Sequence, residues 1–336
     1  MPSNQIIIEN APSIPGLRFR HFRGSDDYPA MAAVLTLSDQ ADKIERQVTV
    51  DSIAASYQNL INCDPYQDMI IAEIAGGVVG YARGWWEDQT PTGLLYRINA
   101  FLLPAWRRKG IGSAMQAWME DRMRTIAATH PPEQKKLFHV TAFHYQDGKA
   151  RLLDKAGYHP ERYFYNMVRP TLDDIPDFPL PEGVELRPVC PMHYWEIWES
   201  FHKDPEDEWG YTEATEEKYQ EWLVHPHFQP NRWQIAWDIS SNQTVGHVLT
   251  FIDDKENQQF NRKRGYTEGV GVDKSWRRRG LARALIVRSL QAQKEAGMSE
   301  SALAADSDSQ SGVISLYESC GFQVVSRDTI YRKPVS

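Results

Sequence analysis

The chain has 336 residues, a length that predicts about two domains of roughly 100–200 residues each. Hydrophobic residues make up 41% of it and charged residues 24%, proportions that exclude a disordered chain or a disulfide-stapled mini-protein. The net charge of −8 argues against a nucleic-acid partner, and the lack of a long apolar run or a signal peptide predicts no membrane partner and a cytoplasmic location.

Cysteine and histidine usage predicts neither disulfide bonds nor a metal site. The three cysteines, Cys63, Cys190 and Cys320, are far apart in the sequence and odd in number, so we expect them to be reduced. The ten histidines include no pair with the H-x-x-x-H spacing of a metal site on a helix.

The first half of the chain alternates between strand and helix patterns. A strand over 17–22 is followed by two helices and then by a hairpin that turns at Gly76-Gly77. A third strand leads into a helix whose apolar residues recur at helical spacing from Ile111 to Ile126. The other expected elements are helices over 26–43 and 50–62, the hairpin over 68–86, strands over 94–103 and 137–144, a helix over 148–156 and a closing strand.

The second half repeats this order after a short linker. The segment TLDDIPDFPLPEG at 171–183 combines prolines, acids and a glycine without any helical or strand period. We therefore expect an N-terminal domain over 1–170, a linker over 171–182 and a C-terminal domain over 183–336. The expected elements of the second domain are strands over 184–188, 264–273 and 301–305, a hairpin over 233–252, and helices over 192–202, 213–224, 281–290 and 311–320.

Two short motifs occur twice, in the same order. WRRKGIG at 106–112 is matched 170 residues later by WRRRGLA at 276–282, and LLDKAGY at 152–158 is matched 164 residues later by LYESCGF at 316–322. A near-constant offset for two ordered motifs indicates a duplicated domain. The period is too long for a solenoid, so each copy is expected to be an α/β domain with a central sheet.

The arginine-rich motif has the features of an anion-binding turn. Each copy follows a strand and opens a helix, where backbone N–H groups lack partners and the helix dipole is positive. The glycine allows a ligand to approach the backbone, and the cations attract a pyrophosphate. The candidate residues are Arg277, Arg278, Arg279, Gly280, Leu281 and Ala282 in the second copy, and Arg107, Arg108, Lys109, Gly110, Ile111 and Gly112 in the first.

Other interpretations of this turn are less favoured. A solvated basic helix start is the simplest alternative, but the matched context of the two copies argues against it. The sequence contains neither G-x-x-x-x-G-K-[ST] nor a G-x-G-x-x-G at the start of a βαβ unit, so the two common nucleotide-binding loops are not expected.

The two motifs together resemble the GNAT superfamily of N-acetyltransferases. VGVDKSWRRRGLARAL at 270–285 and LYESCGF at 316–322 are similar to the two successive acetyl-CoA-binding motifs of that superfamily. FLLPAWRRKGIGSAM at 101–115 matches the first motif well, whereas LLDKAGY matches the second poorly. The tandem arrangement is similar to two-domain members such as the mycothiol synthases, in which the C-terminal domain is catalytic.

This resemblance implies a fold, a cofactor and a set of cofactor-binding residues. The implied fold is two tandem GNAT-like domains, each a mixed, mostly antiparallel central sheet flanked by helices. The implied acyl donor is acetyl-CoA. Besides the two turns, the implied cofactor-binding residues are Val270, Gly271, Val272 and Gln310 in the second copy and Leu102 in the first. Gln310 departs from the family pattern, which carries an asparagine there.

Acyl transfer from a thioester to an amine needs a base for the amine and a proton for the leaving thiolate. The resemblance maps Tyr317 onto the general acid of the family, and the first copy has Leu153 at that position. Glu268 is the candidate base, because strand alternation places it on one face with Val270 and Val272. A solvent-facing or salt-bridged glutamate is the alternative, and a bulge at Gly269 and Gly271 would turn it away.

The first copy is expected to be catalytically degenerate. It has Leu153 in place of Tyr317 and Ile98 in place of Glu268, so it lacks both the acid and the base. It keeps its phosphate turn, and whether it binds coenzyme A is left open.

The acceptor is expected to be a small cationic amine. Seven acids and no lysine or arginine occupy residues 204–217, where they would attract a cation; a solvated loop is the alternative. Nearby aromatic residues would line a pocket or form core: Trp195, Trp198, Trp209 and Tyr211. The leading hypothesis is therefore an acetyl-CoA-dependent N-acetyltransferase, and the alternative is a non-catalytic module that senses acyl-CoA or binds a partner. The oligomeric state is not predicted.

Overall fold

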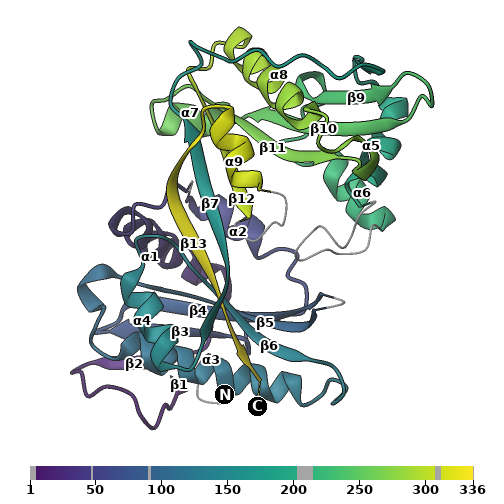
Figure 1. Cartoon of the computed structure of the whole chain (residues 1–336). Helices are drawn as coiled ribbons and strands as arrows, with labels where there is room; N and C mark the ends of the chain where they lie inside the picture. The colour runs from purple at the N-terminus through teal and green to yellow at the C-terminus, as the bar shows by residue number, and fades with distance from the viewer. Residues whose placement is uncertain (1–4, 47, 90–91, 203–214, 307–311, 336) are drawn as a thin grey trace. The chain divides into compact units, whose positions relative to one another are not determined.

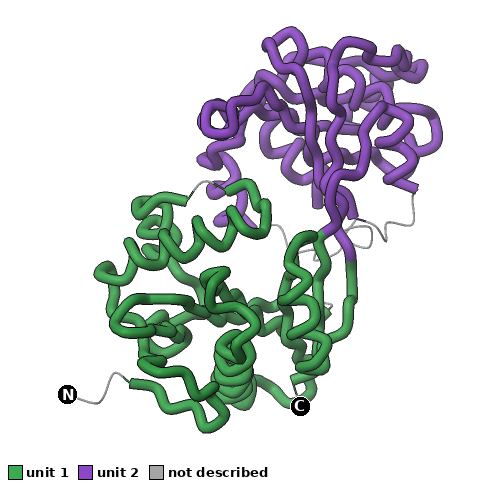
Figure 2. The backbone as a smooth tube through the Cα atoms, turned by 90° about the vertical axis from the view of Figure 1, so that its left-hand side faces the viewer, with its two compact units in different colours: residues 1–162, 328–336 green, residues 163–327 purple. Residues whose placement is uncertain are grey.

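The computed structural model describes residues 5–46, 48–89, 92–202, 215–306 and 312–335 (Figure 1). The chain forms two compact units, which Figure 2 shows in different colours. Unit 1 comprises residues 1–162 and 328–336, and unit 2 comprises residues 163–327.

Unit 1 contains a mixed, mostly antiparallel sheet. Its strands follow the order β1-β2-β3-β4-β5-β6-β13-β7, in which β5 and β6 are parallel and the pairs from β1 to β5 are antiparallel. Its strands are β1 (Gln5–Ile6), β2 (Leu17–Arg20), β3 (Met69–Ile74), β4 (Gly77–Gln89), β5 (Gly93–Leu102) and β6 (Lys136–Ala142), and its helices are α1 (Tyr28–Ala41), α2 (Val50–Ser56), α3 (Ile111–Ala127) and α4 (Asp147–Lys155).

Unit 2 repeats this arrangement. Its strands follow the order β13-β7-β12-β11-β10-β9-β8, with β11 and β12 parallel and the pairs from β8 to β11 antiparallel. Its strands are β8 (Val184–Leu186), β9 (Gln234–Asp238), β10 (Thr244–Ile252), β11 (Arg264–Val272) and β12 (Glu300–Asp306), and its helices are α5 (Tyr194–Phe201), α6 (Glu216–Leu223), α7 (Asp254–Gln259), α8 (Leu281–Glu295) and α9 (Val313–Ser319). The sequence did not predict α7, a short helix capped by the Asp253 carboxylate.

Two long strands, β7 (His159–Arg169) and β13 (Gln323–Pro334), run from one unit into the other. The second part of β7 pairs with β12 of unit 2, from Phe164 opposite Asp306 to Arg169 opposite Ser301. The second part of β13 pairs with β6 of unit 1 through residues 329–334. Each half of the sequence therefore supplies part of a strand to the other unit. The two compact units thus have different bounds from the domains over 1–170 and 183–336 that the sequence predicts.

The proline-rich segment 171–182 belongs to unit 2 and contains no helix or strand. Leu172 is buried, and its N–H donates to the Ser299 carbonyl at 3.0 Å. Arg288 of α8 donates to the Phe178 carbonyl at 3.0 Å. These contacts attach the segment to the α8 side of unit 2.

Each sheet is covered by helices on both faces. In unit 1 one apolar cluster joins the sheet to α3 and Leu153 of α4, and another joins it to α1 and α2. In unit 2 one cluster joins the sheet to α8 and α9, and another contains Ile197 of α5 and three tryptophans. The expected α/β fold of two tandem domains is confirmed. Among the described residues, none of the helices combines the length and apolar character needed to span a bilayer.

Candidate active site

The arginine-rich turn of unit 2 joins the end of β11 to the start of α8. Arg278 and Gly280 both have positive φ, at 61° and 86°, and Gly280 is the N-cap of α8. No side chain caps this helix start, and its first turn contains no acid. Because the first N–H groups of a helix lack intrahelical partners, this end of α8 suits an anion.

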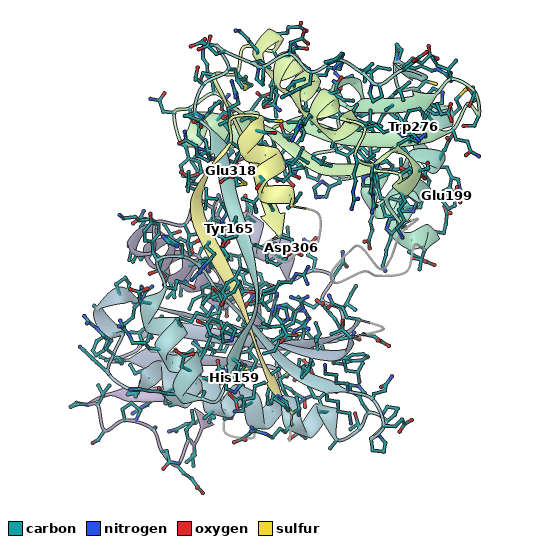
Figure 3. The ribbon with its side chains drawn as sticks, viewed as in Figure 1. His159, Tyr165, Glu199, Trp276, Asp306 and Glu318 are labelled. Atoms are coloured by element: carbon teal, nitrogen blue, oxygen red, sulfur yellow. The ribbon has the colours of Figure 1, made fainter. Side chains whose placement is uncertain are left out.

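The side chains of the turn hold its backbone in place. Arg277 donates from Nε to the Val272 carbonyl at 3.0 Å, which attaches the turn to the end of β11. The guanidinium of Arg279 lies 4.7 Å from the ring centre of Trp276, a residue labelled in Figure 3. Arg277, Arg278, Arg279 and Gly280 are exposed, whereas Leu281 is buried and Ala282 half-buried.

The turn of unit 1 has nearly the same backbone. Arg108 and Gly110 have φ of 61° and 87°, and Arg107 donates from Nε to the Leu102 carbonyl at 3.1 Å. Lys109 lies over Trp106, as Arg279 lies over Trp276. Ile111 is buried, Gly112 lies against Leu152 of α4, and Leu102 packs on the α3 core.

The two turns differ in what surrounds them. A Cβ built on Gly280 would meet nothing within 4 Å, whereas one built on Gly110 would lie 3.2 Å from Pro12. Arg107 also forms an ion pair with the buried carboxylate of Asp42, to which its Nη2 donates at 3.0 Å. The turn of unit 2 is therefore open at its glycine, and the turn of unit 1 is partly covered.

Strand β11 contains a bulge at the centre of the site. His247 of β10 is opposite Gly271, and Leu249 is opposite Glu268. Between these pairs β10 has one residue and β11 has two, so β11 contains one extra residue. Gly269, at φ 54°, lies in the interrupted register. A bulge of this kind shifts the side-chain alternation by one residue.

The expected placement of Glu268 on one face with Val270 and Val272 is therefore wrong. Val270 and Val272 pack on the α8 cluster, whereas Glu268 is opposite Leu249, which packs on the α5 cluster. Gly271 lies directly against the His247 ring, where a Cβ would come within 2.3 Å of Nε2. The bulge does not turn Glu268 away from the site, because Glu268 itself lies where β11 and β12 separate.

The parallel pairing of β11 and β12 ends at Tyr266 and Ala302. Beyond this point Glu268 Oε1 accepts a hydrogen bond from the Ala304 N–H of β12 at 3.2 Å. The carboxylate therefore lies between the two separating strands. Burial raises the pKa of Glu268 to about 7, and the Ala304 hydrogen bond opposes that shift.

Tyr317, on α9, packs in the apolar cluster of α8 and α9. Its side chain is buried, and its ring lies edge-on to Phe322 with the centroids 6.1 Å apart. Burial raises the pKa of Tyr317 above its usual value, and the Glu268 carboxylate and the Cys320 thiol raise it further. The effect of the carboxylate on this pKa indicates that the two residues expected to act as base and acid lie near each other.

The end of α9 has the same backbone as the end of α4. The Phe322 N–H donates to the Tyr317 carbonyl and the Tyr158 N–H to the Leu153 carbonyl, each across five residues, and Gly321 and Gly157 have positive φ. This hydrogen-bond pattern is the Schellman motif. Leu153 therefore lies where Tyr317 lies in the other unit, and its side chain is fully buried in the core.

The counterpart of Glu268 in unit 1 is not Ile98. Strand β5 pairs with β4 without a register shift, and Ile98 packs on the α3 core. Without a bulge, the residue on the opposite face at this level is Asn99, which pairs with Arg83. A fixed offset of 170 residues misses this because it ignores the extra residue in β11.

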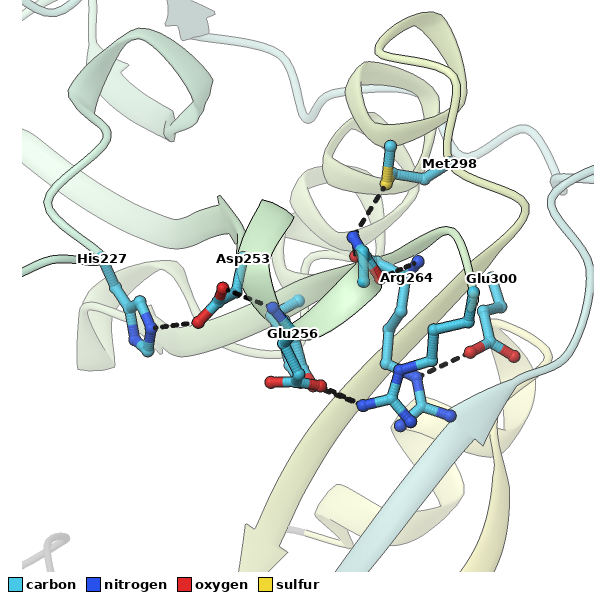
Figure 4. Close-up of polar contacts among 9 residues, drawn as sticks. His227, Asp253, Glu256, Arg264, Met298 and Glu300 are labelled. Carbon is cyan, nitrogen blue, oxygen red and sulfur yellow. Dashed lines mark hydrogen bonds and ion pairs between the residues drawn. The ribbon is translucent and has the colours of Figure 1, made fainter. Parts of the chain in front are cut away.

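The other end of β11 carries a closed polar network (Figure 4). Arg264 binds Glu300 at 2.7 Å, and Asp253 lies 3.5 Å from His227. Glu256 contacts both Arg262 and the hydroxyl of Tyr266, and it raises the pKa of that phenol beyond the effect of burial. The hydroxyl of Tyr266 thus donates a hydrogen bond to the Glu256 carboxylate.

The aromatic residues before β9 mostly form core. Trp198 is buried and packs against Trp222, with ring centroids 5.3 Å apart, whereas Trp195 is exposed and touches Tyr219. Trp209, Tyr211 and most of the acidic segment 204–217 lie outside the described residues, as does Gln310. Of the acids, Glu216 and Glu217 are described, and both are exposed at the start of α6.

His247 has a structural environment. Its Nδ1 lies 3.3 Å from Ser200 Oγ, and its ring centroid is 4.3 Å from that of Phe201. Burial lowers the pKa of His247 to about 3, so the ring is neutral. Among the described residues, no group of three or more histidine, cysteine or acidic side chains is arranged to hold a metal ion.

Sequence comparisons identify both halves of the chain. A family model described as the acetyltransferase (GNAT) family matches residues 194–322, and one described as an acetyltransferase (GNAT) domain matches residues 65–160. The chain is 26% identical to the mycothiol acetyltransferase of Salinispora arenicola over 318 residues, which cover 91% of this chain and 94% of that protein. It is 30% identical to the mycothiol acetyltransferase of Thermobispora bispora over 192 residues, covering 55% of this chain and 61% of that protein.

Solved structures share the fold over nearly the whole chain. A GCN5-related N-acetyltransferase from Sphaerobacter thermophilus superposes with a TM-score of 0.76 at 23% identity, covering 97% of each chain. A tandem GNAT protein from the clavulanic acid biosynthesis pathway superposes with a TM-score of 0.65 at 16% identity, covering 95% of this chain and 99% of that one. At these identities the likeness establishes the tandem fold.

Proposed function

Because the chain belongs to the GNAT family of acetyltransferases, we propose that it transfers an acetyl group from acetyl-CoA to the amine of a small acceptor. The chemistry is assigned to unit 2. The observation that carries this proposal is the buried Glu268 carboxylate between β11 and β12, near enough to Tyr317 of α9 to raise the pKa of its phenol, in the unit whose turn at the start of α8 is open.

The turn of unit 2 fits the pyrophosphate of coenzyme A. Its support is the uncapped start of α8, the left-handed backbone at Arg278 and Gly280, and the exposed arginines. Gly280, with no atom within 4 Å of a built Cβ, leaves room for close approach. Val270 and Val272 pack on the α8 core, so contact with the acyl-donor arm would come from the backbone of β11.

In this mechanism Glu268 removes a proton from the acceptor amine. An alkylammonium has a pKa near ~10 and is not nucleophilic, so a base is needed at neutral pH. With its pKa raised to about 7, the Glu268 carboxylate is both partly ionised and basic enough to accept that proton. The Ala304 N–H holds Oε1, and the second carboxylate oxygen is left for the amine or a bridging water.

Tyr317 supplies the proton that the departing sulfur needs. Acetyl-CoA, when bound, would supply the acetyl group as a thioester; the amine nitrogen would gain the acyl carbon as the C–S bond breaks, and coenzyme A would leave as the thiol. Because burial and Glu268 raise the pKa of Tyr317, its Oη keeps its proton until a thiolate develops nearby. Leu153 holds no proton to transfer, and Asn99 is not a base, which supports a non-catalytic role for unit 1.

The proposed acceptor class is a small cationic amine. The curated relatives named above are mycothiol acetyltransferases, which supports a small-molecule acceptor over a protein one. The exposed acids Glu216 and Glu217 on α6 and the net charge of −8 support attraction of a cation.

Direct detection of the released thiol tests this function. The protein is mixed with acetyl-CoA and a panel of amines that includes the acceptor of mycothiol acetyltransferases, a polyamine, an aminoglycoside and an amino sugar. We expect amine-dependent release of one free thiol for each acetylated product. If acetyl-CoA binds but no amine releases thiol, the acyl-CoA-sensing module is the better description; if acetyl-CoA does not bind, both proposals fail.

A further inference from the structure

In unit 1 a cationic cavity lies at the level that Glu268 occupies in unit 2, and its lining includes Asn99, the counterpart of Glu268. The parallel pairing of β5 and β6 ends at Arg97 and His139, and the two strands then separate, as β11 and β12 do. A cavity of about 190 Å³ lies at this separation, and a second of about 280 Å³ shares Arg46, Asn99 and Phe101 with it. Both are smaller than the roughly 300–1,000 Å³ of drug-sized ligand sites, so the ligand they suit is small.

Strand alternation brings the polar side chains of these two cavities to one face of the sheet. On the face opposite α3, β4 carries Arg83 and Trp85, which pair with Asn99 and Arg97 of β5. Arg46, from the loop after α1, and Lys149, from α4, complete the cationic lining. None of the described residues that line the two cavities is an aspartate or a glutamate.

The nearby carboxylates balance only part of this charge. Arg97 binds Glu87 at 2.7 Å, and Arg46 lies 3.4 Å from Asp39. Four lining cations therefore have three carboxylates near them: Glu87, Asp39, and Asp42, which raises the pKa of Lys149 and is itself paired with Arg107. Burial lowers the pKa of Lys149 to about 8 and Arg46 lowers it further, which is the effect expected of excess positive charge.

Arg83 is the cation whose position most directly suggests a ligand. Its guanidinium lies near the rings of Tyr57 and Trp85, 4.8 Å and 5.1 Å from their centres. Its Nη1 is buried and has no hydrogen-bond partner in the described part of the chain. A buried donor without a partner is costly, so an acceptor at this atom would stabilise the fold.

The lining of the cavity also excludes the acceptor class proposed for unit 2. A cationic amine entering here would meet like charges and no carboxylate, whereas an oxyanion would meet planar guanidinium groups that donate paired hydrogen bonds. Asn99 and Thr141 add neutral polar groups to the same wall. We propose that unit 1 binds a small oxyanion with two or more negative charges where these two cavities adjoin, held by Arg97 and Lys149, which line the first cavity, and by Arg83, which lines the second.

This assignment does not depend on acetyl transfer by unit 2. Its ligand chemistry is that of a small carboxylate or phosphate, and the test separates the two sources. Calorimetric titrations of the full chain use succinate, citrate or inorganic phosphate, with propylammonium chloride as the cationic control. Saturating coenzyme A is present throughout, so that the arginine-rich turns do not compete for the anions.

We expect at least one of the anions to bind with one site per chain, and the preferred one identifies the source as carboxylate or phosphate. Arg83→Gln should weaken that binding by about tenfold or more, since a charged hydrogen bond is lost. Lys149→Gln should weaken it by about threefold to tenfold, because Lys149 contributes a point charge at the edge. Arg18→Gln removes an exposed arginine of β2 in the same unit and should change affinity by less than about twofold.

Thermal unfolding without ligand shows whether each variant is folded. If Arg83→Gln does not fold, Lys149→Gln and the loss of affinity at high salt decide the question. The proposal is overturned if no anion binds when coenzyme A saturates, if propylammonium binds as tightly, or if folded Arg83→Gln and Lys149→Gln bind like the parent protein.

Discussion

The two units have almost the same backbone at their key positions and opposite chemistry. Both have an arginine-rich turn with matched left-handed residues, both have a Schellman motif after the next helix, and both have a pair of separating parallel strands. Unit 2 places the Glu268 carboxylate at the separation, whereas unit 1 places cations there. A duplicated scaffold thus keeps its backbone geometry while the side chains decide the function of each copy.

A single extra residue in β11 changes which positions of the two copies correspond. The bulge in β11 moves Glu268 to the face of α5 while Val270 and Val272 stay on the face of α8. In unit 1, β5 has no bulge, and Ile98 is buried under α3. If the two copies differ in function as much as in side chains, substitutions at matched positions of the two units should have unequal effects.

Tyr317→Phe should have the largest effect. It removes the proton donor and keeps the ring that packs against Phe322, so we expect kcat to fall by about 10²–10⁴-fold with unchanged affinity for acetyl-CoA. Leu153→Met, a volume-conserving change at the matching position of unit 1, is the control and should leave kcat within about twofold. Steady-state kinetics and calorimetry measure the two quantities. An unchanged kcat in Tyr317→Phe would remove the phenol from the mechanism.

Glu268→Gln should lower kcat/KM by about 10²-fold near neutral pH, since the amide cannot accept the proton. The pKa of Glu268 is raised to about 7, so the active carboxylate form is lost as the pH falls through 7. In the parent protein kcat/KM should therefore fall about tenfold per pH unit below 7, with a further contribution from the acceptor amine.

The pH profile distinguishes a base from a structural carboxylate. With the same acceptor, the pH profile of kcat/KM for Glu268→Gln should lose the fall near pH 7 that Glu268 causes. It should keep the fall that protonation of the acceptor amine causes. A variant that keeps both falls at lower activity would show that Glu268 only orients the strands.

The turn glycines offer a matched pair. Alanine at Gly280 or Gly110 is forced into a left-handed backbone, which costs about 1–2 kcal/mol of stability at either position. At Gly110 the new methyl group also meets Pro12 at 3.2 Å, so Gly110→Ala should be the more destabilised variant. Gly280→Ala should also bind acetyl-CoA about tenfold more weakly, because its N–H groups are displaced. Equal weakening of binding by the two variants would mean that both turns hold coenzyme A.

Local sequence patterns predicted the duplicated fold, the two turns and the pairing of Tyr317 with Leu153. These features depend on residues close together in the chain, and their physical causes are local: helix starts, left-handed glycines and strand alternation. The bulge was visible as Gly269 and Gly271, but glycine alone does not say which strand register results. Only pairing with His247 and Leu249 settles it.

The features that sequence patterns missed depend on distant residues. The exchange of β7 and β13 between units leaves no local signal, because the second part of each strand would fit either sheet. The contact of Pro12 with Gly110, the ion pair of Asp42 with Arg107 and the cationic cavity of unit 1 all join segments far apart in the sequence. The cationic lining in particular collects single cations from three elements and one loop, and these cations form no motif in the sequence.

The smallest expected effect concerns His247, which is buried below the bulge. Burial lowers the pKa of His247 to about 3, against about 6.5 in the unfolded chain, so the folded state binds the proton less well. Its neutral form supports full stability above pH 6.5, and stability falls as the pH drops below that value. At pH 5.5 the loss amounts to about 1.4 kcal/mol from this residue. His247→Gln should flatten the pH dependence of chemical unfolding by that amount, whereas His159→Gln, at an exposed position, should not. If both variants keep the slope of the parent protein, the ring takes up its proton without unfolding, and the packing of Gly271 on His247 is looser than the structure shows.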